Sequence, residues 1–212
     1  EKNIFTPAQT FGTVRIFSHF FNQNEVQNPR SGESGKFDTK EYKLLNPDWV
    51  HLEEPDACLA AHGFETLKAY GDSWDDGFNS LRNLVHQLHS LNEVTKAASE
   101  WAPDIVLFVR PDLFYHSSVR KHIATALKCE SASVILPAWQ NHQNGYNDRF
   151  AICRMPSAIE AYGTRVKSMH VFCSSGQVPL HSERLLRFVL DEAELTPCWM
   201  STRASRMRIG GR

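Results

Sequence analysis

Two short motifs place an aspartate next to an arginine where predicted strands meet loops. Arg110-Pro111-Asp112 directly follows the apolar run 104–109, and Asp148-Arg149 precedes the run 150–153. An aspartate at the end of a buried strand can bind a divalent cation that bridges nucleotide phosphates. An aspartate beside a substrate hydroxyl can accept its proton as a general base, and the next arginine can orient that aspartate or a substrate oxygen.

Each motif also has a structural alternative. Asp112 can cap a turn or pair with Arg110, and Asp148 can form an Asx-turn with a surface ion pair. The position of Asp112 after a strand leaves its two interpretations about equal. The chemistry of the second motif depends on Asp148 facing the same crevice that the first motif enters.

A third polar motif, His181-Ser182-Glu183, precedes the predicted helix 185–190. His181 offers a nitrogen ligand to a metal, and Glu183 can hydrogen-bond to a sugar hydroxyl. The alternative is that His181 or Ser182 belongs to a helix N-cap. By contrast, His86 and His89 have no metal-ligand spacing with a supporting partner, so we interpret them as surface or core residues.

Three arginines are candidates for binding phosphate. Arg30 lies in the turn-rich segment 28–35, and Arg206 and Arg208 lie near the end of the chain. We expect these segments to order when an anionic ligand binds. Solvated surface charge is the alternative interpretation.

The surrounding pattern alternates strands with helices. Apolar residues at steps of three and four from Phe78 to Thr95 predict a long helix, and the runs 104–109 and 133–137 are typical of buried strands. Further predicted strands cover 14–20, 49–52 and 150–153, with short strands or coil after Trp199. Further helices are expected over 56–70, ending at Gly71, over 119–128 and from Pro156 onward. This order predicts an α/β fold with a mainly parallel or mixed sheet, whose ligands bind at the carboxyl ends of the strands.

Composition narrows the classes of protein. The 212 residues are 42% hydrophobic and 22% charged with a formal net charge of −1, which favours one globular domain and argues against a nucleic-acid partner. The longest apolar run is far shorter than the roughly 20 residues that cross a bilayer, so no integral membrane segment is expected. Five widely spaced cysteines indicate reduced core thiols.

Several enzyme signatures are missing from the sequence. It contains neither the phosphate-binding loop of P-loop enzymes nor the G-x-G-x-x-G fingerprint of dinucleotide-binding enzymes. The G-x-S-x-G nucleophile elbow and the H-E-x-x-H zinc helix are also absent.

Four segments together resemble the GT-A-type glycosyltransferases. They are the strand Asp104 to Val109 with Arg110-Pro111-Asp112-Leu113, the segment Asn147 to Ala151, the late His181-Ser182-Glu183 and the closing Arg206-Met207-Arg208. Members of that group serve bacterial capsular polysaccharide synthesis and capsid glycosylation in large algal viruses. The resemblance spans nearly the whole chain and implies a single GT-A-like (Rossmann-like) domain over 1–212. Helices would flank its central sheet.

The resemblance also implies roles for particular residues. In GT-A enzymes a D-x-D motif holds Mn²⁺ or Mg²⁺ against the donor diphosphate. Arg110 replaces the first aspartate here, so Asp112 would keep the metal together with His181. Asp148 would be the catalytic base, assisted by Arg149, and Asn147 and Glu183 would contact the acceptor or sugar. The expected donor-binding residues are Ser18, His19, Phe20, Arg30, Gln87, Arg110, Arg206 and Arg208.

The expected function is therefore transfer of a sugar from a nucleotide donor, with a UDP-sugar expected, to a hydroxyl of a glycan, with inversion. A metal-dependent hydrolase using Asp112, Asp148, His181 and Glu183 is one alternative. A non-catalytic module that binds nucleotide or sugar is another. If the chain belongs to a longer protein, other catalytic domains of that protein are a further expected class of partner. The expected compartment is the cytoplasm, or the Golgi lumen if a membrane anchor was trimmed.

Overall fold

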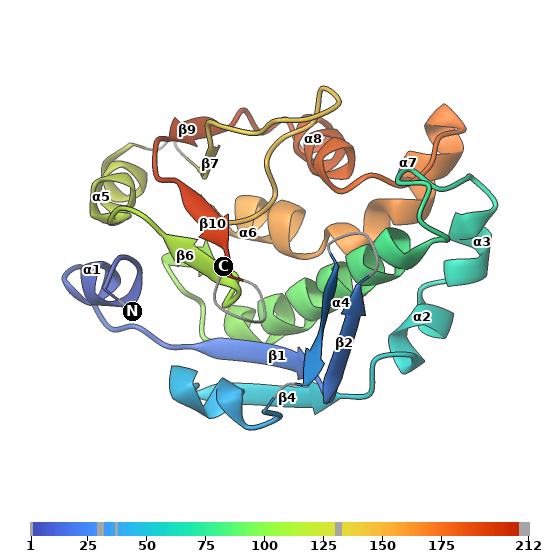
Figure 1. Ribbon diagram of the computed structural model, residues 1–212. Coiled ribbons are helices and arrows are strands. Elements are labelled where there is room, and N and C mark those ends of the chain that lie inside the picture. Colours follow the sequence, from blue (N-terminus) through green and yellow to red (C-terminus); the bar gives the residue numbers. More distant parts are fainter. Residues whose placement is uncertain (1, 29–31, 37, 130–132, 208–212) are drawn as a thin grey trace. The chain divides into compact units, whose positions relative to one another are not determined.

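The computed structural model describes residues 2–28, 32–36, 38–129 and 133–207. The chain divides into two compact units, each assembled from separate segments (Figure 1). Unit 1 contains residues 1–14, 102–162 and 182–212, and unit 2 contains residues 15–101 and 163–181. One domain over 1–212 was expected from the sequence, and no local pattern in the sequence indicates these two units.

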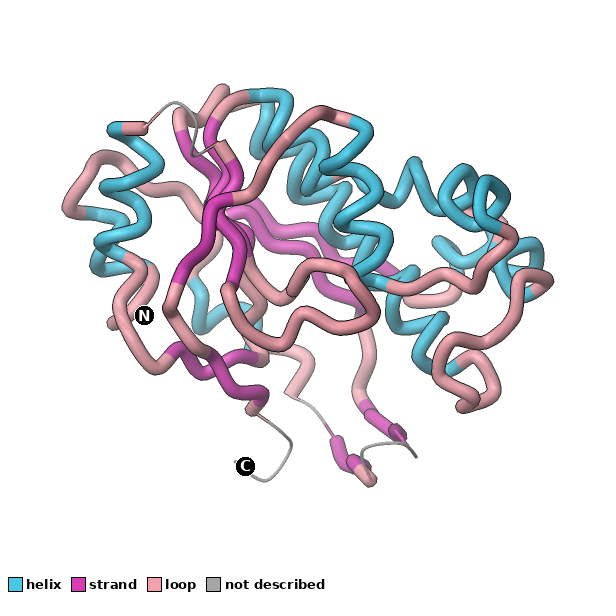
Figure 2. Tube along the Cα trace, turned by 90° about the horizontal axis from the view of Figure 1, so that it is seen from above, coloured by secondary structure: helices cyan, strands magenta, loops and turns pink. Residues whose placement is uncertain are grey.

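Unit 1 is built on a four-stranded mixed sheet in the order β5-β8-β7-β9. Its strands are β5 (Ile105–Phe108), β7 (Val134–Pro137), β8 (Ala151–Arg154) and β9 (Cys198–Met200). Strand β8 runs antiparallel to both β5 and β7, whereas β7 and β9 are parallel. Figure 2 shows the strands of the chain in magenta and its helices in cyan. Four consecutive buried residues in β7 confirm the expected buried strand.

The remaining elements of unit 1 surround this sheet. Strands β6 (Leu113–Tyr115) and β10 (Ala204–Arg206) form a separate antiparallel pair. The helices are α1 (Phe5–Gln9), α5 (Arg120–Lys128), α6 (Pro156–Gly163), whose last residue belongs to unit 2, and α8 (Ser182–Glu192). The core of this unit joins α5 to the sheet through Ile123, Ala126, Ile135 and Ile152.

Unit 2 packs the long helix α4 (Asn79–Ser99) against strand β1 (Phe17–Phe21). Strand β1 pairs in parallel with β4 (Trp49–Glu53), and β2 (Glu25–Asn28) forms a hairpin with β3 (Glu33–Lys36). Shorter elements complete the unit: η1 (Glu41–Leu45), α2 (Ala57–Ala61), α3 (Phe64–Lys68), η2 (Arg165–Ser168) and α7 (Met169–Gly176).

Helix α4 confirms the expected apolar stripe. Leu81, Val85, Leu88 and Thr95 are all buried. The carboxylate of Asp76 accepts hydrogen bonds from the Ser80 N–H at 3.1 and 3.2 Å, which satisfies a donor in the first turn of the helix.

Two expectations about local structure are wrong. The helix expected over 56–70 is two short helices, α2 and α3, because Gly63 between them has a left-handed φ of 62°. Strand β5 was expected to be covered on both faces. It is instead an edge strand whose first three residues are only partly buried.

The cysteines and the helices bear on two further expectations. None of the five cysteines forms a disulfide bond; three of them are buried, but Cys129 is exposed and is not a core thiol. Among the described residues, no helix combines the length and the apolar character that crossing a bilayer requires.

Candidate functional site

In unit 1, the motif after β5 closes on itself as an ion pair. The Arg110 guanidinium donates from Nε to Asp112 Oδ1 at 2.9 Å and from Nη2 to Asp112 Oδ2 at 2.8 Å. This two-bond geometry is the strong form of an arginine–carboxylate pair. The structure thus contains the pairing that the sequence offered as the alternative role of Asp112.

The strand pair β6–β10 brings a second arginine to the same carboxylate. Arg206 lies across from Leu113, and its Nε is 3.5 Å from Asp112 Oδ2. The backbone N–H of Met207 also donates to the Asp112 carbonyl at 2.7 Å. Burial raises the pKa of Asp112, but hydrogen bonds and charge from Arg110 and the charge of Arg206 outweigh it, and the pKa lies below its ordinary value. Arg110 and Arg206, two expected phosphate-binding residues, therefore lie together.

The Asp112 site does not fit a divalent cation. A hard cation takes several oxygen ligands, whereas Asp112 is bound by two guanidinium groups that a cation would have to displace. Where the structure is described, three metal-ligating side chains come together in unit 2 alone, and neither Asp112 nor His181 is among them. His181 also belongs to unit 2, where its ring stacks on Trp74 at 5.4 Å. These contacts give no support to the expected binding of Mn²⁺ or Mg²⁺ at Asp112 and His181.

The hydroxyl of Tyr115 forms a hydrogen bond with the backbone of the motif after β5. It accepts a hydrogen bond from the Arg110 N–H at 3.1 Å. Burial raises the pKa of Tyr115 to about 12, although its contact with the Arg110 backbone lowers it. The hydroxyl therefore stays neutral at physiological pH and holds the backbone of Arg110 in place.

The loop before β8 is held by Asn147. This side chain is fully buried, and its amide donates to the Trp139 carbonyl at 2.6 Å while its oxygen accepts from the Arg149 N–H at 3.1 Å. Sequence reasoning expected Asn147 to contact the acceptor or sugar. In the structure its hydrogen-bonding groups serve the loop backbone instead, because a buried loop must satisfy its polar groups internally.

Two carboxylates of unit 1 are buried in this part of the structure. Asp148 and Glu183 are 8% and 7% exposed. The Tyr162 hydroxyl donates to the Asp148 carbonyl at 2.8 Å, and the His142 N–H donates to Glu183 Oε2 at 2.6 Å. Burial raises the pKa of Glu183, and the charge of Asp148 raises it further, while the His142 N–H lowers it. The charge of Asp148 also acts on Arg110, which connects the two motifs.

The position of Glu183 is set by contact between backbones. A side chain at Gly145 would place its Cβ 2.3 Å from the backbone carbon of Glu183, so only glycine fits. The Tyr146 N–H donates to the Glu183 carbonyl at 3.0 Å. Arg149 bonds to Gln140 through its guanidinium, which also lies 5.2 Å from the Trp139 ring. Arg149 therefore points along the loop, in a position that supports it.

Four expected donor-binding residues belong to unit 2. Ser18 and His19 are buried on β1, and the Phe20 ring lies 6.0 Å from that of Tyr42. Gln87 is half-buried on α4. Arg30 and Arg208, also expected to bind the donor, lie outside the described residues.

A cluster around Glu53 was not predicted from the sequence. This carboxylate accepts from His19 and His89, and His51 lies beside them. His89 is therefore not an isolated surface or core residue, as it was interpreted. The available signal was His51-x-Glu53 at the end of the predicted strand 49–52, because residues two apart on a strand point to the same face.

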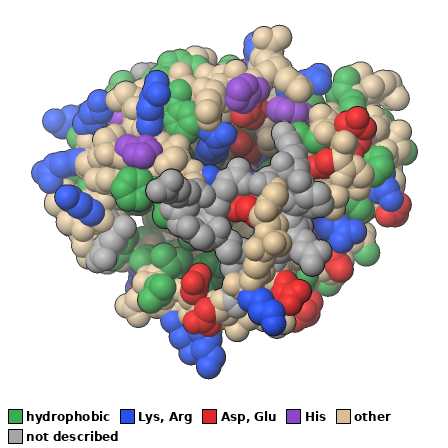
Figure 3. All heavy atoms as spheres, viewed as in Figure 1, with side chains coloured by type: hydrophobic (Ala, Val, Ile, Leu, Met, Phe, Trp, Pro, Cys, Tyr) green, Lys and Arg blue, Asp and Glu red, His purple; other side chains and the backbone are tan. Residues whose placement is uncertain are grey.

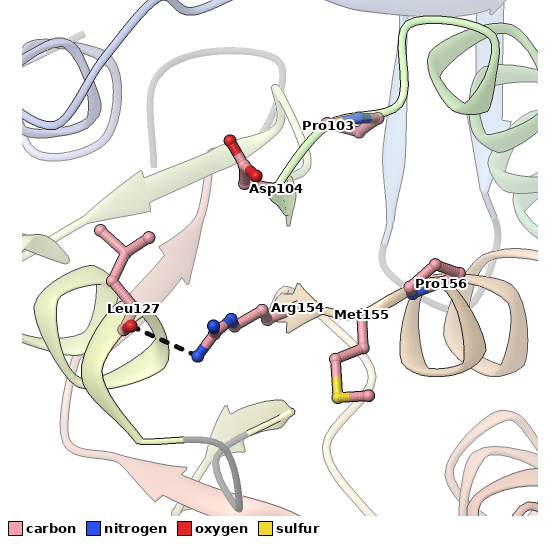
Figure 4. A pocket seen from close by; sticks show the side chains of 6 residues that line it. All are labelled: Pro103, Asp104, Leu127, Arg154, Met155 and Pro156. Atoms are coloured by element: carbon pink, nitrogen blue, oxygen red, sulfur yellow. Dashed lines mark hydrogen bonds between the residues drawn. The ribbon is translucent and has the colours of Figure 1, made fainter.

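The described surface offers one further hollow in unit 1 (Figure 4). A pocket of about 280 Å³ is lined by Pro103, Asp104, Leu127, Arg154, Met155 and Pro156. Arg154 donates to the Leu127 carbonyl across it at 3.3 Å. Because Asp104 precedes β5 and Arg110 follows it, this pocket lies at the other end of the strand from the acidic motifs.

Figure 3 shows basic, acidic and histidine side chains on the same face, in keeping with the near-zero net charge.

Comparison with known proteins gives no assignment: no protein-family model, no curated protein and no solved structure matches the chain.

Proposed function

We propose that unit 1 carries the chemistry of a glycosyltransferase, moving a sugar from a nucleotide-diphosphate donor to a hydroxyl of a glycan. The observation that carries this proposal is the burial of two carboxylates, Asp148 and Glu183, in the unit that also holds the Arg110–Asp112 pair. Such a pair beside a cation is what proton removal and anion departure require together.

The proposed step moves one proton and exchanges one bond. Asp148 takes the proton of the acceptor hydroxyl. The oxygen of that hydroxyl forms a bond to the anomeric carbon of the sugar. The bond from that carbon to the donor diphosphate breaks, and the electron pair leaves with the nucleotide. Arg110 and Arg206 offset the negative charge on the departing diphosphate. Attack from the opposite side inverts the anomeric carbon.

Glu183 has a separate part in this proposal. Its raised pKa keeps a proton on the carboxyl over a wider pH range than an ordinary glutamate. A protonated carboxyl can donate a hydrogen bond to a sugar hydroxyl, which positions the ring next to Asp148.

No step of this reaction passes through a metal ion. The residues at Asp112 do not fit one, and the arginines supply positive charge in its place. When Mn²⁺ or Mg²⁺ accompanies a nucleotide donor, it screens the diphosphate. Dependence of the rate on either ion is a result that the experiment below measures separately.

The test is Asp148→Asn, which keeps the shape of the side chain and removes the proton acceptor. Sugar transfer is measured against a panel of nucleotide-sugars and glycan acceptors, and nucleotide binding is measured on the same folded sample. Turnover should fall roughly 10²–10⁴-fold, with nucleotide affinity nearly unchanged. Asp104→Asn, an exposed carboxylate before β5, is the matched control and should keep parental turnover.

Other outcomes overturn the proposal. Parental turnover by Asp148→Asn would remove Asp148 from the reaction. Release of free sugar without transfer would indicate the hydrolase instead. If the parent protein binds a nucleotide or sugar but converts none of the panel, the non-catalytic binding module becomes the better account.

A further inference from the structure

Unit 2 contains a cluster of histidines around one carboxylate that the proposed reaction does not use. Strands β1 and β4 pair in parallel so that His19 lies directly across from His51. Glu53 follows two residues after His51 and so points to the same face of the strand. Helix α4 packs against β1 and supplies His89 and Ser90. Three elements therefore converge on Glu53.

One oxygen of Glu53 accepts two hydrogen bonds. His19 Nε2 lies 3.1 Å and His89 Nε2 lies 2.7 Å from Glu53 Oε2. The other nitrogen of each ring also has a partner: His19 Nδ1 is 3.0 Å from Ser90 Oγ, and His89 Nδ1 is 2.9 Å from His62 Nε2. Every ring nitrogen of His19 and His89 thus has a partner, and the Glu53 carboxylate, which only accepts, makes Nε2–H the donor in both rings.

We infer that His19, His51 and Glu53 form a binding site for a zinc-class divalent ion. Their ligand atoms all lie within 4.8 Å of one another. In a tetrahedral zinc site, ligand atoms at about 2.0–2.2 Å from the ion are roughly 3.3–3.5 Å apart. The His19–Glu53 separation of 3.1 Å is already close to that value.

Binding needs only small movements. The ion takes the place of the hydrogen between His19 Nε2 and Glu53 Oε2. The His19 ring then carries its proton on Nδ1, and this N–H donates a hydrogen bond to Ser90 Oγ. His51 is exposed, so its ring can rotate toward the ion without disturbing the core. The Glu53 side chain is 22% exposed, whereas that of His19 is fully buried, so the ion enters from the side of His51 and Glu53.

The donor set selects the class of ion. Two imidazoles and one carboxylate suit zinc and its neighbours, whereas Mg²⁺ and Ca²⁺ prefer oxygen ligands alone. Three protein ligands leave a fourth position for water, the pattern of a zinc site that is open to a further ligand.

The outer residues hold the ligands in position. Ser90 orients His19, and the His62–His89 pair orients the second hydrogen bond to Glu53. The Phe21 ring lies 5.2 Å from the His19 ring and limits the access of water to its buried side. Outer partners of this kind usually affect metal affinity by about 10–100-fold.

The experiment titrates the full chain, without an affinity tag, with Zn²⁺ against a chromophoric chelator, and with Co²⁺ followed by visible absorption. We expect one saturable site and the absorption bands of tetrahedral Co²⁺. His51→Gln and Glu53→Gln should each weaken Zn²⁺ binding by more than about 100-fold, beyond the loss of an outer partner. Ser90→Ala should weaken it by about 10–100-fold.

His116→Gln is the matched control, because His116 is exposed in unit 1 and bonds to Ser205 at 2.9 Å. Its Zn²⁺ affinity should equal that of the parent. Circular dichroism without metal verifies that each variant is folded, and His51→Gln keeps the test decisive because that side chain is exposed. No saturable site, or equal affinity in His51→Gln and the parent, overturns the inference. Sugar transfer is not part of the readout, so failure here leaves the proposed function standing.

Discussion

The two units satisfy their carboxylates with different kinds of donor. In unit 1, Asp112 is bound by Arg110, and Glu183 accepts a backbone N–H. Neither donor loses its proton at accessible pH. In unit 2, Glu53 is bound by the imidazoles of His19 and His89, which can lose theirs. The difference teaches that a carboxylate bound by arginine is fixed as an ion pair, whereas one bound by histidine can exchange a proton for a metal ion.

The largest effect should be loss of stability in acid, because several histidines contribute together. Burial lowers the pKa values of His19, His62 and His86 in unit 2. Below about 6.5, the ordinary histidine pKa, the unfolded chain binds more protons than the folded one, so the free energy of unfolding falls as the pH drops. The lowered pKa of Glu53 adds a loss at still lower pH, below its ordinary value of 4.5.

Denaturant unfolding at pH 7.5, 6.0 and 5.0 measures this loss. His62→Gln should make stability depend less on pH over this range, whereas His116→Gln, at an exposed histidine of unit 1, should leave the dependence unchanged. Equal pH dependence in His62→Gln and the parent would contradict the contrast between the units.

The next largest loss of stability should come from Gly145→Ala, which displaces the backbone of Glu183. The new Cβ would meet the backbone of Glu183 and Arg184, which has no flexible end that can move aside. We expect a loss of about 1–3 kcal/mol in the free energy of unfolding, measured by denaturant titration. Gly12→Ala, where nothing lies within 4 Å of the added Cβ, should change it by less than about 0.5 kcal/mol.

A smaller effect is expected for Arg110→Gln, which removes both hydrogen bonds to Asp112. The pair is partly exposed, with side chains 27% and 36% accessible, and Arg206 remains, so solvent screening limits the loss to about 1 kcal/mol. This loss should stay constant between pH 5 and 7, unlike that of the histidine cluster. Arg187→Gln, in the exposed pair with Asp191, should cost less. A loss from Arg110→Gln that varies with pH over this range would mean that Asp112 is not fixed as described.

The smallest effect should be that of Glu65→Gln. Glu65 pairs with Lys68 on the surface at 2.9 Å, but its side chain is 81% exposed. Pairs of this kind in helices contribute at most about 0.5 kcal/mol, and salt screens them. Thermal unfolding at low and high salt should detect little change. A loss of stability as large as that of Arg110→Gln would show that burial does not explain the difference between Glu65 and Asp112.

Much of the local structure follows from the sequence. The stripe from Phe78 to Thr95 predicts α4, and the apolar run 133–137 predicts β7, because the period and length of apolar residues depend on neighbours in the chain. Pro156 likewise marks the start of α6. The acidic motifs at Asp112, Asp148 and Glu183 are also evident from residue types and from their places between elements.

The tertiary structure decided which partners these residues meet. The antiparallel direction of β8 and the edge position of β5 depend on pairing between distant segments, which no local pattern encodes. The ion pair at Asp112 was an open alternative that geometry resolved. The cluster at Glu53 needed His19, His51 and His89 from three elements, because a strand register and a helix packing together bring residues as much as 71 positions apart, such as His19 and Ser90, to hydrogen-bond distance.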